Sequence, residues 1–390
     1  MADVENPKVL IGASIPRSGH HFLADMMTGY FGPELYYCEY YTLANCCKQV
    51  PCTRRGRFGV IYQKSHDRDF KLPADVADAL YLIQYRHPVP EALSDRELDI
   101  KDTLGRPSLA YRQTRAGFMQ WLAAKAVYYR RFHDKWMAER LPNALYLDYA
   151  ELSAKPADTL REIVTRAGAV PDEAHLRRVV ERSGGSRGGG AETYKPRVVS
   201  DSPYFDAELL GALEDFVLKR CPAYGFTREL SGSYEESALY GLILLKDQSE
   251  PLPKGGDGKR FKLAAKLAPD HPEVRRRNIV RMLRENHVSQ ALTRAQALIE
   301  DEPLFAPGYE LLFKISADSD APVPESALTG NALIACSESA ELLGSLADAF
   351  LAAGYAVNAV AASSLAAQLA PKSEKIRERL DAAMASATKK

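Results

Sequence analysis

Residues 8–23 read KVLIGASIPRSGHHFL, and this stretch decides how the chain begins to fold. Its apolar part, Lys8–Ile15, predicts a strand, and Pro-Arg-Ser-Gly at 16–19 predicts a tight turn before a helix that begins at His20. Such a turn directs backbone N–H groups and a helix N-terminus toward one point, which favours a bound phosphate or sulfate. The Gly-x-x-x-x-Gly-Lys-Ser/Thr spacing of a Walker A loop is absent. The stretch therefore predicts an anion-binding loop of a different kind.

Length and charge limit what the rest of the chain can be. With 390 residues it is long enough for two domains. The 51 basic and 51 acidic residues give a formal net charge of zero, so no overall field favours nucleic acid and an anion site has to be local. The first residues do not resemble a targeting segment, and no apolar run approaches the roughly 18 residues that a membrane helix needs. We expect a cytoplasmic protein with no membrane span.

In the front part of the chain, up to position 230, apolar runs alternate with helical patterns. Such alternation predicts an α/β fold in which a parallel sheet is flanked by helices, with ligands at the carboxyl ends of the strands. The strand candidates are Lys8–Ile15, Gly59–Gln63, Leu80–Tyr85 and Ala144–Asp148, and the helix candidates are His20–Tyr30, Ser108–Arg140 and Ala157–Ala167.

The last third of the chain has a different pattern, rich in alanine and leucine and without a strand signal. Pro269, Pro303 and Pro371 recur at one and then two steps of a common period, with small residues in the same phase. A helix–turn–helix period of about 34 residues resembles tetratricopeptide (TPR) repeats, and an irregular helical bundle is the alternative. We predict an α/β domain over 1–232, a helix and Pro/Gly linker over 233–258, and an all-α TPR-like domain over 259–390.

Four further motifs follow the opening loop. They are Tyr-Gln-Lys-Ser-His at 62–66, the segment from Arg86 to Ser94, the Tyr-Leu-Asp-Tyr segment that ends at Tyr149, and a glycine-rich stretch from Arg187 to Lys195. In this order they resemble the sulfotransferases that use 3′-phosphoadenosine-5′-phosphosulfate (PAPS). The resemblance covers most of residues 8–230 and implies sulfonate transfer to a hydroxyl or amine, with 3′,5′-ADP as the product.

The resemblance also implies roles for individual residues. Lys64 would bind the sulfonate and the bridging oxygen, and His66, with an ordinary pKa near 6.5, would act as general base. Glu39 is the alternative base, because carbohydrate sulfotransferases often use a glutamate after the first helix. The donor-binding set would be Arg17, Ser18, Gly19, His20, His21, Phe22, Arg86, Ser94, Tyr149, Arg187 and Gly189. The two histidines stand where the family often has Ser or Thr.

Four cysteines, Cys38, Cys46, Cys47 and Cys52, lie close together in the sequence. Their spacing fits no familiar zinc site, so we expect reduced thiols and no metal. The acceptor (a glycan, a lipid or a small molecule) stays open, as does a protein partner or a second copy of the chain at the helical repeats. Two other functions are considered: a scaffold whose front half is a relic nucleotide site, and a small-molecule kinase, which the missing Gly-Lys-Ser/Thr disfavours.

Overall fold

The structure is a computed structural model that describes residues 8–40, 46–54, 56–103, 106, 109–185, 198–247 and 256–388. It divides into two compact units. The first comprises the described parts of Met1–Asp99 and Ala124–Glu235, and the second those of Ile100–Ala123 and Glu236–Lys390. Among the described residues, none of the helices combines the length and apolar character that crossing a membrane requires.

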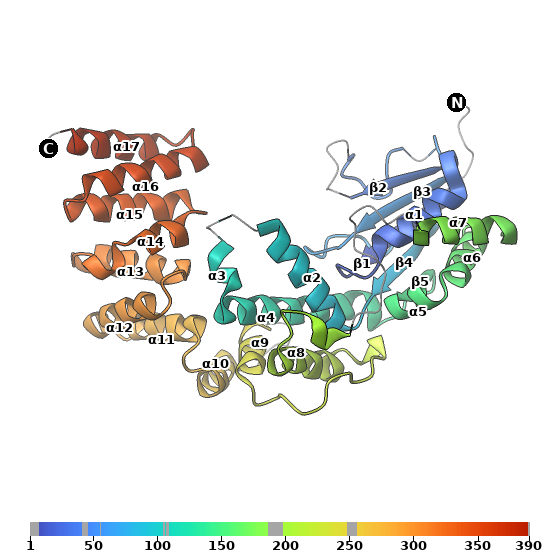
Figure 1. Cartoon of the computed structure of the whole chain (residues 1–390), viewed down its shortest axis with the longest axis horizontal. Coiled ribbons are helices and arrows are strands. Elements are labelled where there is room, and N and C mark those ends of the chain that lie inside the picture. The colour runs from blue at the N-terminus through green and yellow to red at the C-terminus, as the bar shows by residue number, and fades with distance from the viewer. Residues whose placement is uncertain are drawn as a thin grey trace. The chain divides into compact units, whose positions relative to one another are not determined.

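A five-stranded parallel sheet forms the centre of the first unit, in the order β2-β3-β1-β4-β5 (Figure 1). This confirms the predicted α/β class and four of its strands, whereas the edge strand β2 was not predicted. The strands are β1 (Lys8–Ser14), β2 (Leu35–Glu39), β3 (Val60–Ser65), β4 (Ala79–Tyr85) and β5 (Ala144–Asp148).

Helices cover the sheet because successive strand residues point to opposite faces. On one face, Leu10, Tyr62 and Leu82 pack with apolar residues of α1 (His20–Phe31), α5 (Tyr149–Ala154), α6 (Pro156–Arg166) and α7 (Glu173–Gly185). On the other face, the ring of Tyr81 lies 5.8 Å from that of Trp136, which follows α4. The unit also contains α8 (Ala207–Arg220) and most of α2 (Pro88–Thr103).

The single helix predicted over Ser108–Arg140 is wrong, because the described part is broken. It forms α3 (Ala110–Gln113), α4 (Arg115–Phe132) and a π-helical turn, His133–Met137. Thr114 is extended between the first two, and its Oγ accepts a hydrogen bond from the Gly117 N–H at 3.0 Å. A Cβ on Gly117 would lie 1.9 Å from the carbonyl oxygen of Tyr111, so only glycine allows this close approach.

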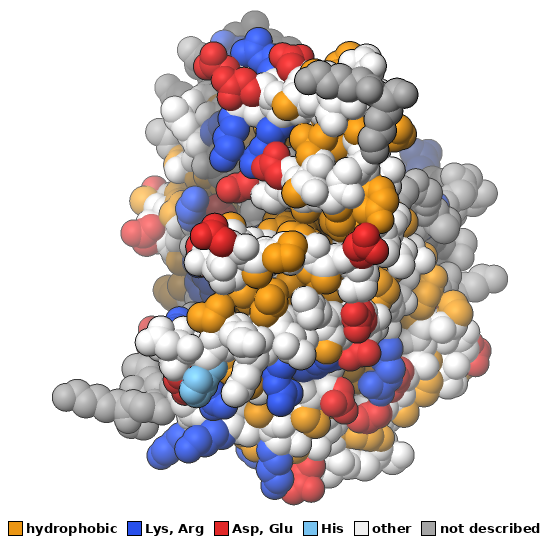
Figure 2. Space-filling view, turned by 90° about the vertical axis from the view of Figure 1, so that its left-hand side faces the viewer, with side chains coloured by type: hydrophobic (Ala, Val, Ile, Leu, Met, Phe, Trp, Pro, Cys, Tyr) orange, Lys and Arg blue, Asp and Glu red, His pale blue; other side chains and the backbone are white. Residues whose placement is uncertain are grey.

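In the second unit, four of the helices after residue 256 begin at equal steps along the sequence. They begin at Pro272, Ala306, Ala340 and Glu374, and each step matches the TPR period. Gly354 has a φ of 82° in the turn between the helices Ala340–Ala352 and Ala356–Leu369. Figure 2 is a view onto this array, in which apolar side chains form patches among charged ones. From residue 236 onward, the described helices of the second unit are α9 (Ala238–Lys246), α10 (Gly256–Leu267), α11 (Pro272–Arg284), α12 (Val288–Asp301), α13 (Ala306–Ser319), α14 (Gly330–Cys336), α15 (Ala340–Ala352), α16 (Ala356–Leu369) and α17 (Glu374–Ala387).

Buried alanines and large apolar residues together form the core of this array. Ala291, Ala359 and Ala366 are fully buried beside Phe305 and Phe350. Small side chains at repeated positions allow neighbouring helices to approach closely, and the larger ones fill the space between pairs. The array is interrupted between α13, which ends at Ser319, and the short α14, which begins only at Gly330.

Candidate functional site

The predicted site residues of the first unit gather at the carboxyl edge of the sheet. The anion loop follows β1, Glu39 ends β2, Lys64 lies near the end of β3, and Arg86 follows β4. In parallel sheets this edge is where ligands bind, because the loops that leave the strands converge there. Residues far apart in the sequence are thereby brought to one place.

The loop from Ile15 to Gly19 is held in an unusual backbone conformation. Arg17 and Gly19 have φ of 60° and 84°, both in the left-handed region. For a residue with a Cβ this costs about 1 kcal/mol, so Arg17 is held by its surroundings. The Ser18 hydroxyl is buried and donates to the Ile15 carbonyl at 2.6 Å. The Ser18 side chain therefore fixes the turn, and its backbone and that of Gly19 lead directly into α1.

Arg17, Ser94, Arg86 and Tyr149 come together around this loop. The Arg17 Nε donates to the Ser94 hydroxyl at 3.0 Å, across 77 residues of sequence. Arg86 donates from Nη1 to the Arg17 carbonyl at 3.0 Å, and its guanidinium lies 4.1 Å from the centroid of the Tyr149 ring. Two cations, a hydroxyl and an aromatic ring therefore share one location, which is a suitable composition for a nucleotide phosphate next to a base.

Two carboxylates on α2 lie near these arginines and are paired with a lysine. The Lys125 ammonium donates to Glu91 at 2.7 Å and to Asp95 at 2.8 Å. Burial raises the pKa of Glu91 to about 7, against the opposing effect of Lys125. Lys125 thus offsets much of the negative charge that would otherwise cancel that of Arg17 and Arg86.

Lys64 and His66 form a second cluster. The His66 Nδ1–H donates to the Ser14 carbonyl at 2.8 Å, because a carbonyl oxygen can only accept. Its Nε2 therefore carries the lone pair, and it accepts from the Lys64 ammonium at 2.8 Å. This network assigns the tautomer. Burial, and then the charge of Lys64, lowers the pKa of His66 to about 3, so the ring is neutral at physiological pH.

Burial also lowers the pKa of Lys64 to about 8, although Glu39 partly opposes this shift. Lys64 is 3% exposed, and its Nζ lies 3.5 Å from the Glu39 carboxylate. The two residues are paired in the register of β2 and β3, so their side chains share one face of the sheet. A lysine so buried and close to neutrality can act both as a charge and as a hydrogen-bond donor.

Glu39 and the first two residues of α1 complete the cluster. The His20 Nε2 lies 3.7 Å from the Glu39 carboxylate, and its ring centroid is 4.8 Å from that of His66. Burial lowers the pKa of His20 far below its usual range, so this ring is also neutral. The Tyr37 hydroxyl donates to Glu39 at 3.3 Å. Both candidate bases, His66 and Glu39, thus contact Lys64.

Three further predicted donor-binding residues are Phe22, Arg187 and Gly189. Phe22 is buried in the apolar core between α1 and the sheet. Arg187 and Gly189 lie outside the described residues. The sulfur atoms of Cys38 and Cys46 are 4.0 Å apart and those of Cys47 and Cys52 are 3.7 Å apart, and none of these four cysteines is in a disulfide.

Several supporting residues were not predicted from the sequence. The Tyr128 hydroxyl, on α4, donates to the His66 carbonyl at 2.5 Å. Asp67, directly after His66, is 1% exposed and accepts from Lys135 at 2.7 Å and from the Trp136 indole at 2.9 Å. These contacts hold the end of β3 against α4 and its π-helical turn. The sequence holds one sign of these contacts: a lysine and tyrosines interrupt the apolar pattern of Ala123–Tyr129, which could have indicated a helix face that contacts polar groups.

The chain matches no protein-family model and no curated protein. Among solved structures it is similar to the crystal structure of mouse sulfotransferase SULT7A1 complexed with PAP. The TM-score is 0.37 at 14% sequence identity, and the alignment covers 56% of this chain and 86% of that chain. At this level of similarity, every assignment of a residue or a reaction has to come from the chain itself.

Proposed function

We propose that the first unit is a PAPS-dependent sulfotransferase. The main support is that three segments selected for their resemblance to that family meet at one sheet edge. There Arg17 is hydrogen-bonded to Ser94, and Lys64 is hydrogen-bonded to His66. The first pair is 77 residues apart in the sequence, so only the fold brings it together.

The two clusters would bind different parts of the donor. Arg86, Ser94 and Arg17 supply charge-assisted hydrogen bonds for the phosphates, and the ring of Tyr149, over which the Arg86 guanidinium lies, would contact the adenine. Lys64 supplies positive charge to the sulfonate oxygens and to the bridging oxygen, where negative charge develops as the S–O bond breaks.

His66 is our first choice for the base. Its Nδ1–H is committed to Ser14, which leaves Nε2 to take a proton. Sulfonate oxygens would give Lys64 stronger hydrogen-bond acceptors than an imidazole and so release Nε2. In the transfer step the acceptor oxygen forms a bond to sulfur, its proton passes to Nε2, and 3′,5′-ADP leaves with the electron pair of the broken S–O bond. Glu39 is the alternative base.

For the second unit we propose a TPR-like array that binds a partner protein, a second copy of the chain or part of a large acceptor. The support is the equal spacing of helix starts from Pro272 to Glu374. A groove of about 1020 Å³ runs along α13 and α15, with polar and apolar side chains on its walls. Its lining includes Phe313, Leu342, Asp348 and Arg379.

Radiolabelled sulfonate transfer tests the enzymatic proposal. The full chain is incubated with ³⁵S-labelled PAPS and with cell extracts fractionated by polarity, and labelled products are sought. We expect a labelled product in a subset of fractions with the wild-type chain and none with Lys64→Ala. A product that forms equally with Lys64→Ala, or transfer of the γ-phosphate of ATP in place of the sulfonate, would contradict the proposal.

A further inference from the structure

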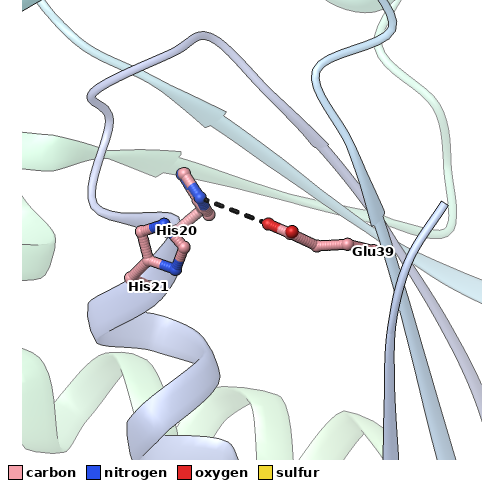
Figure 3. Close-up of side chains that lie close together, drawn as sticks. All are labelled: His20, His21 and Glu39. Carbon is pink, nitrogen blue, oxygen red and sulfur yellow. Dashed lines mark ion pairs between the residues drawn. The ribbon is translucent and has the colours of Figure 1, made fainter. Parts of the chain in front are cut away.

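His20, His21 and Glu39 form a group with the chemistry of a metal site (Figure 3). One ligand atom from each residue lies within 4.8 Å of the others. No second trio of His, Cys, Asp or Glu as close as this occurs in the part of the chain that the structure describes. The two histidines open α1 and the glutamate ends β2, so ordered secondary structure holds all three.

The separations are close to those that a small cation requires. In a tetrahedral zinc site, bonds of about 2.0–2.2 Å place neighbouring ligand atoms about 3.4 Å apart. The His20 Nε2 is already 3.7 Å from the Glu39 carboxylate, and the two imidazole centroids are 3.9 Å apart, tilted by 43°. Rotation of side chains would therefore suffice to bring the three ligand atoms around one ion.

Burial also fits an open metal site. His20 is buried, Glu39 is partly exposed and His21 is exposed, so an ion could enter from solvent and keep water as a further ligand. The Lys64 ammonium, whose Nζ lies 3.5 Å from the Glu39 carboxylate, opposes metal binding, because a bound cation would repel it. Its contact with the His66 Nε2 gives Lys64 another partner.

We propose that His20, His21 and Glu39 bind one divalent transition-metal ion of the zinc type. Two imidazoles and one carboxylate, with positions left for water, are a ligand set that such ions favour. The site departs from the expectation of a metal-free chain, since its ligands come from two separate elements and match no spacing motif. Because His20 and Glu39 also face Lys64 and His66, the ion would exclude the sulfonate or the acceptor. The bound ion would therefore inhibit sulfonate transfer reversibly. This inhibition rests on the proposed sulfotransferase function, whereas metal binding does not.

Calorimetry with Zn²⁺ and absorption spectroscopy with Co²⁺ test the binding on the full, chelator-treated chain. We expect one ion per chain and, for Glu39→Gln and His21→Ala, affinity lower by about 10- to 100-fold or more, since loss of even an outer-shell partner costs that much. His287→Ala, which removes an exposed histidine of the second unit, should bind as wild type does. Circular dichroism verifies folding, and the two exposed or partly exposed positions avoid reliance on the buried His20.

Two results would overturn the metal site. One is Zn²⁺ affinity that is unchanged in both Glu39→Gln and His21→Ala. The other is a thiolate-to-cobalt charge-transfer band that disappears in a Cys46→Ser, Cys47→Ser double variant, which would assign the ion to the cysteines. Binding that depends on His21 and Glu39 in a chain that never transfers sulfonate would leave the metal site standing and remove only the proposed function.

Discussion

Lys64 lowers the pKa of His66. The Lys64 ammonium contacts the only ring nitrogen of His66 that has a lone pair, and Lys64 is buried while His66 is half-buried. Burial and then the charge of Lys64 leave a neutral imidazole with a pKa of about 3, and burial lowers the pKa of Lys64 to about 8. A ring with so low a pKa is a weak base, so in the proposed reaction Lys64 would turn to the sulfonate before Nε2 takes the proton.

The pH dependence of kcat/KM for PAPS should reflect Lys64 and not a typical histidine. Activity needs charged Lys64, so kcat/KM should fall as the pH rises through about 8. It also needs neutral His66, whose pKa of about 3 predicts no loss as the pH falls from 7 to 5. Lys64→Arg should move the basic limb to higher pH. A steep loss of kcat/KM near pH 6.5 would contradict this protonation scheme.

Substitution should separate the two candidate bases. We expect His66→Ala to lower kcat by roughly 100-fold or more, with PAPS affinity within a few-fold of wild type, since proton transfer contributes mainly to the chemical step. Glu39→Gln should lower kcat less. Steady-state kinetics and calorimetry measure the two effects. If His66→Ala turns over like wild type and Glu39→Gln does not, the roles have to be exchanged.

At the level of residues, sequence motifs located Arg17, Lys64, His66, Arg86 and Ser94 at the sheet edge. They did not locate Lys125, whose partners Glu91 and Asp95 lie 34 and 30 positions away. A lysine among alanines on a helix has the same local pattern whether it faces solvent or two buried carboxylates. Only the packing of α4 against α2 distinguishes the two cases.

At the level of elements, strong periodic patterns were predictable, but short or interrupted ones were not in every case. The inner strands β1, β3 and β4 are buried along almost their whole length, as expected inside a parallel sheet. The two edge strands are equally short and only partly buried: β5, Ala-Leu-Tyr-Leu-Asp, was predicted, whereas β2, Leu-Tyr-Tyr-Cys-Glu, was not. The break at Thr114 was missed because the apolar period continues through it, while the cause is a side-chain cap on the Gly117 N–H.

The helical array should be sensitive to added volume at its repeated alanines. Ala359 on α16 is fully buried, whereas Ala361 on the same helix is exposed. We expect Ala359→Leu to lower the free energy of unfolding of the second unit by about 1–3 kcal/mol, because a well-packed core resists extra methylenes. Ala361→Leu should stay within about 0.5 kcal/mol of wild type. Denaturant unfolding followed by circular dichroism measures both, and equal effects would mean that these helices do not pack closely at Ala359.

At the level of the whole molecule, composition indicated a change from an α/β pattern to an all-α pattern near residue 250, but it did not show to which compact unit each segment belongs. The described residues of Ile100–Ala123 form one compact unit with the carboxy-terminal helices, and within that unit the ring of Tyr111 lies 5.4 Å from that of Phe305. Contacts between segments so distant in the sequence leave no mark on composition or period. The boundaries at 232 and 259 remain predictions.

We propose that the chain recognises a 3′-phosphorylated adenine nucleotide through Arg86 and Ser94. Calorimetric titration of the full chain with 3′,5′-ADP and with 5′-AMP measures this recognition. We expect 3′,5′-ADP to bind about 10- to 100-fold more tightly, since a charge-assisted hydrogen bond contributes about 1.5–3 kcal/mol. Arg86→Ala or Ser94→Ala should remove most of this preference, and Arg161→Ala, at an exposed ion pair on α6, should preserve it. Equal affinity of the wild-type chain for the two nucleotides would mean that the site does not recognise the 3′-phosphate.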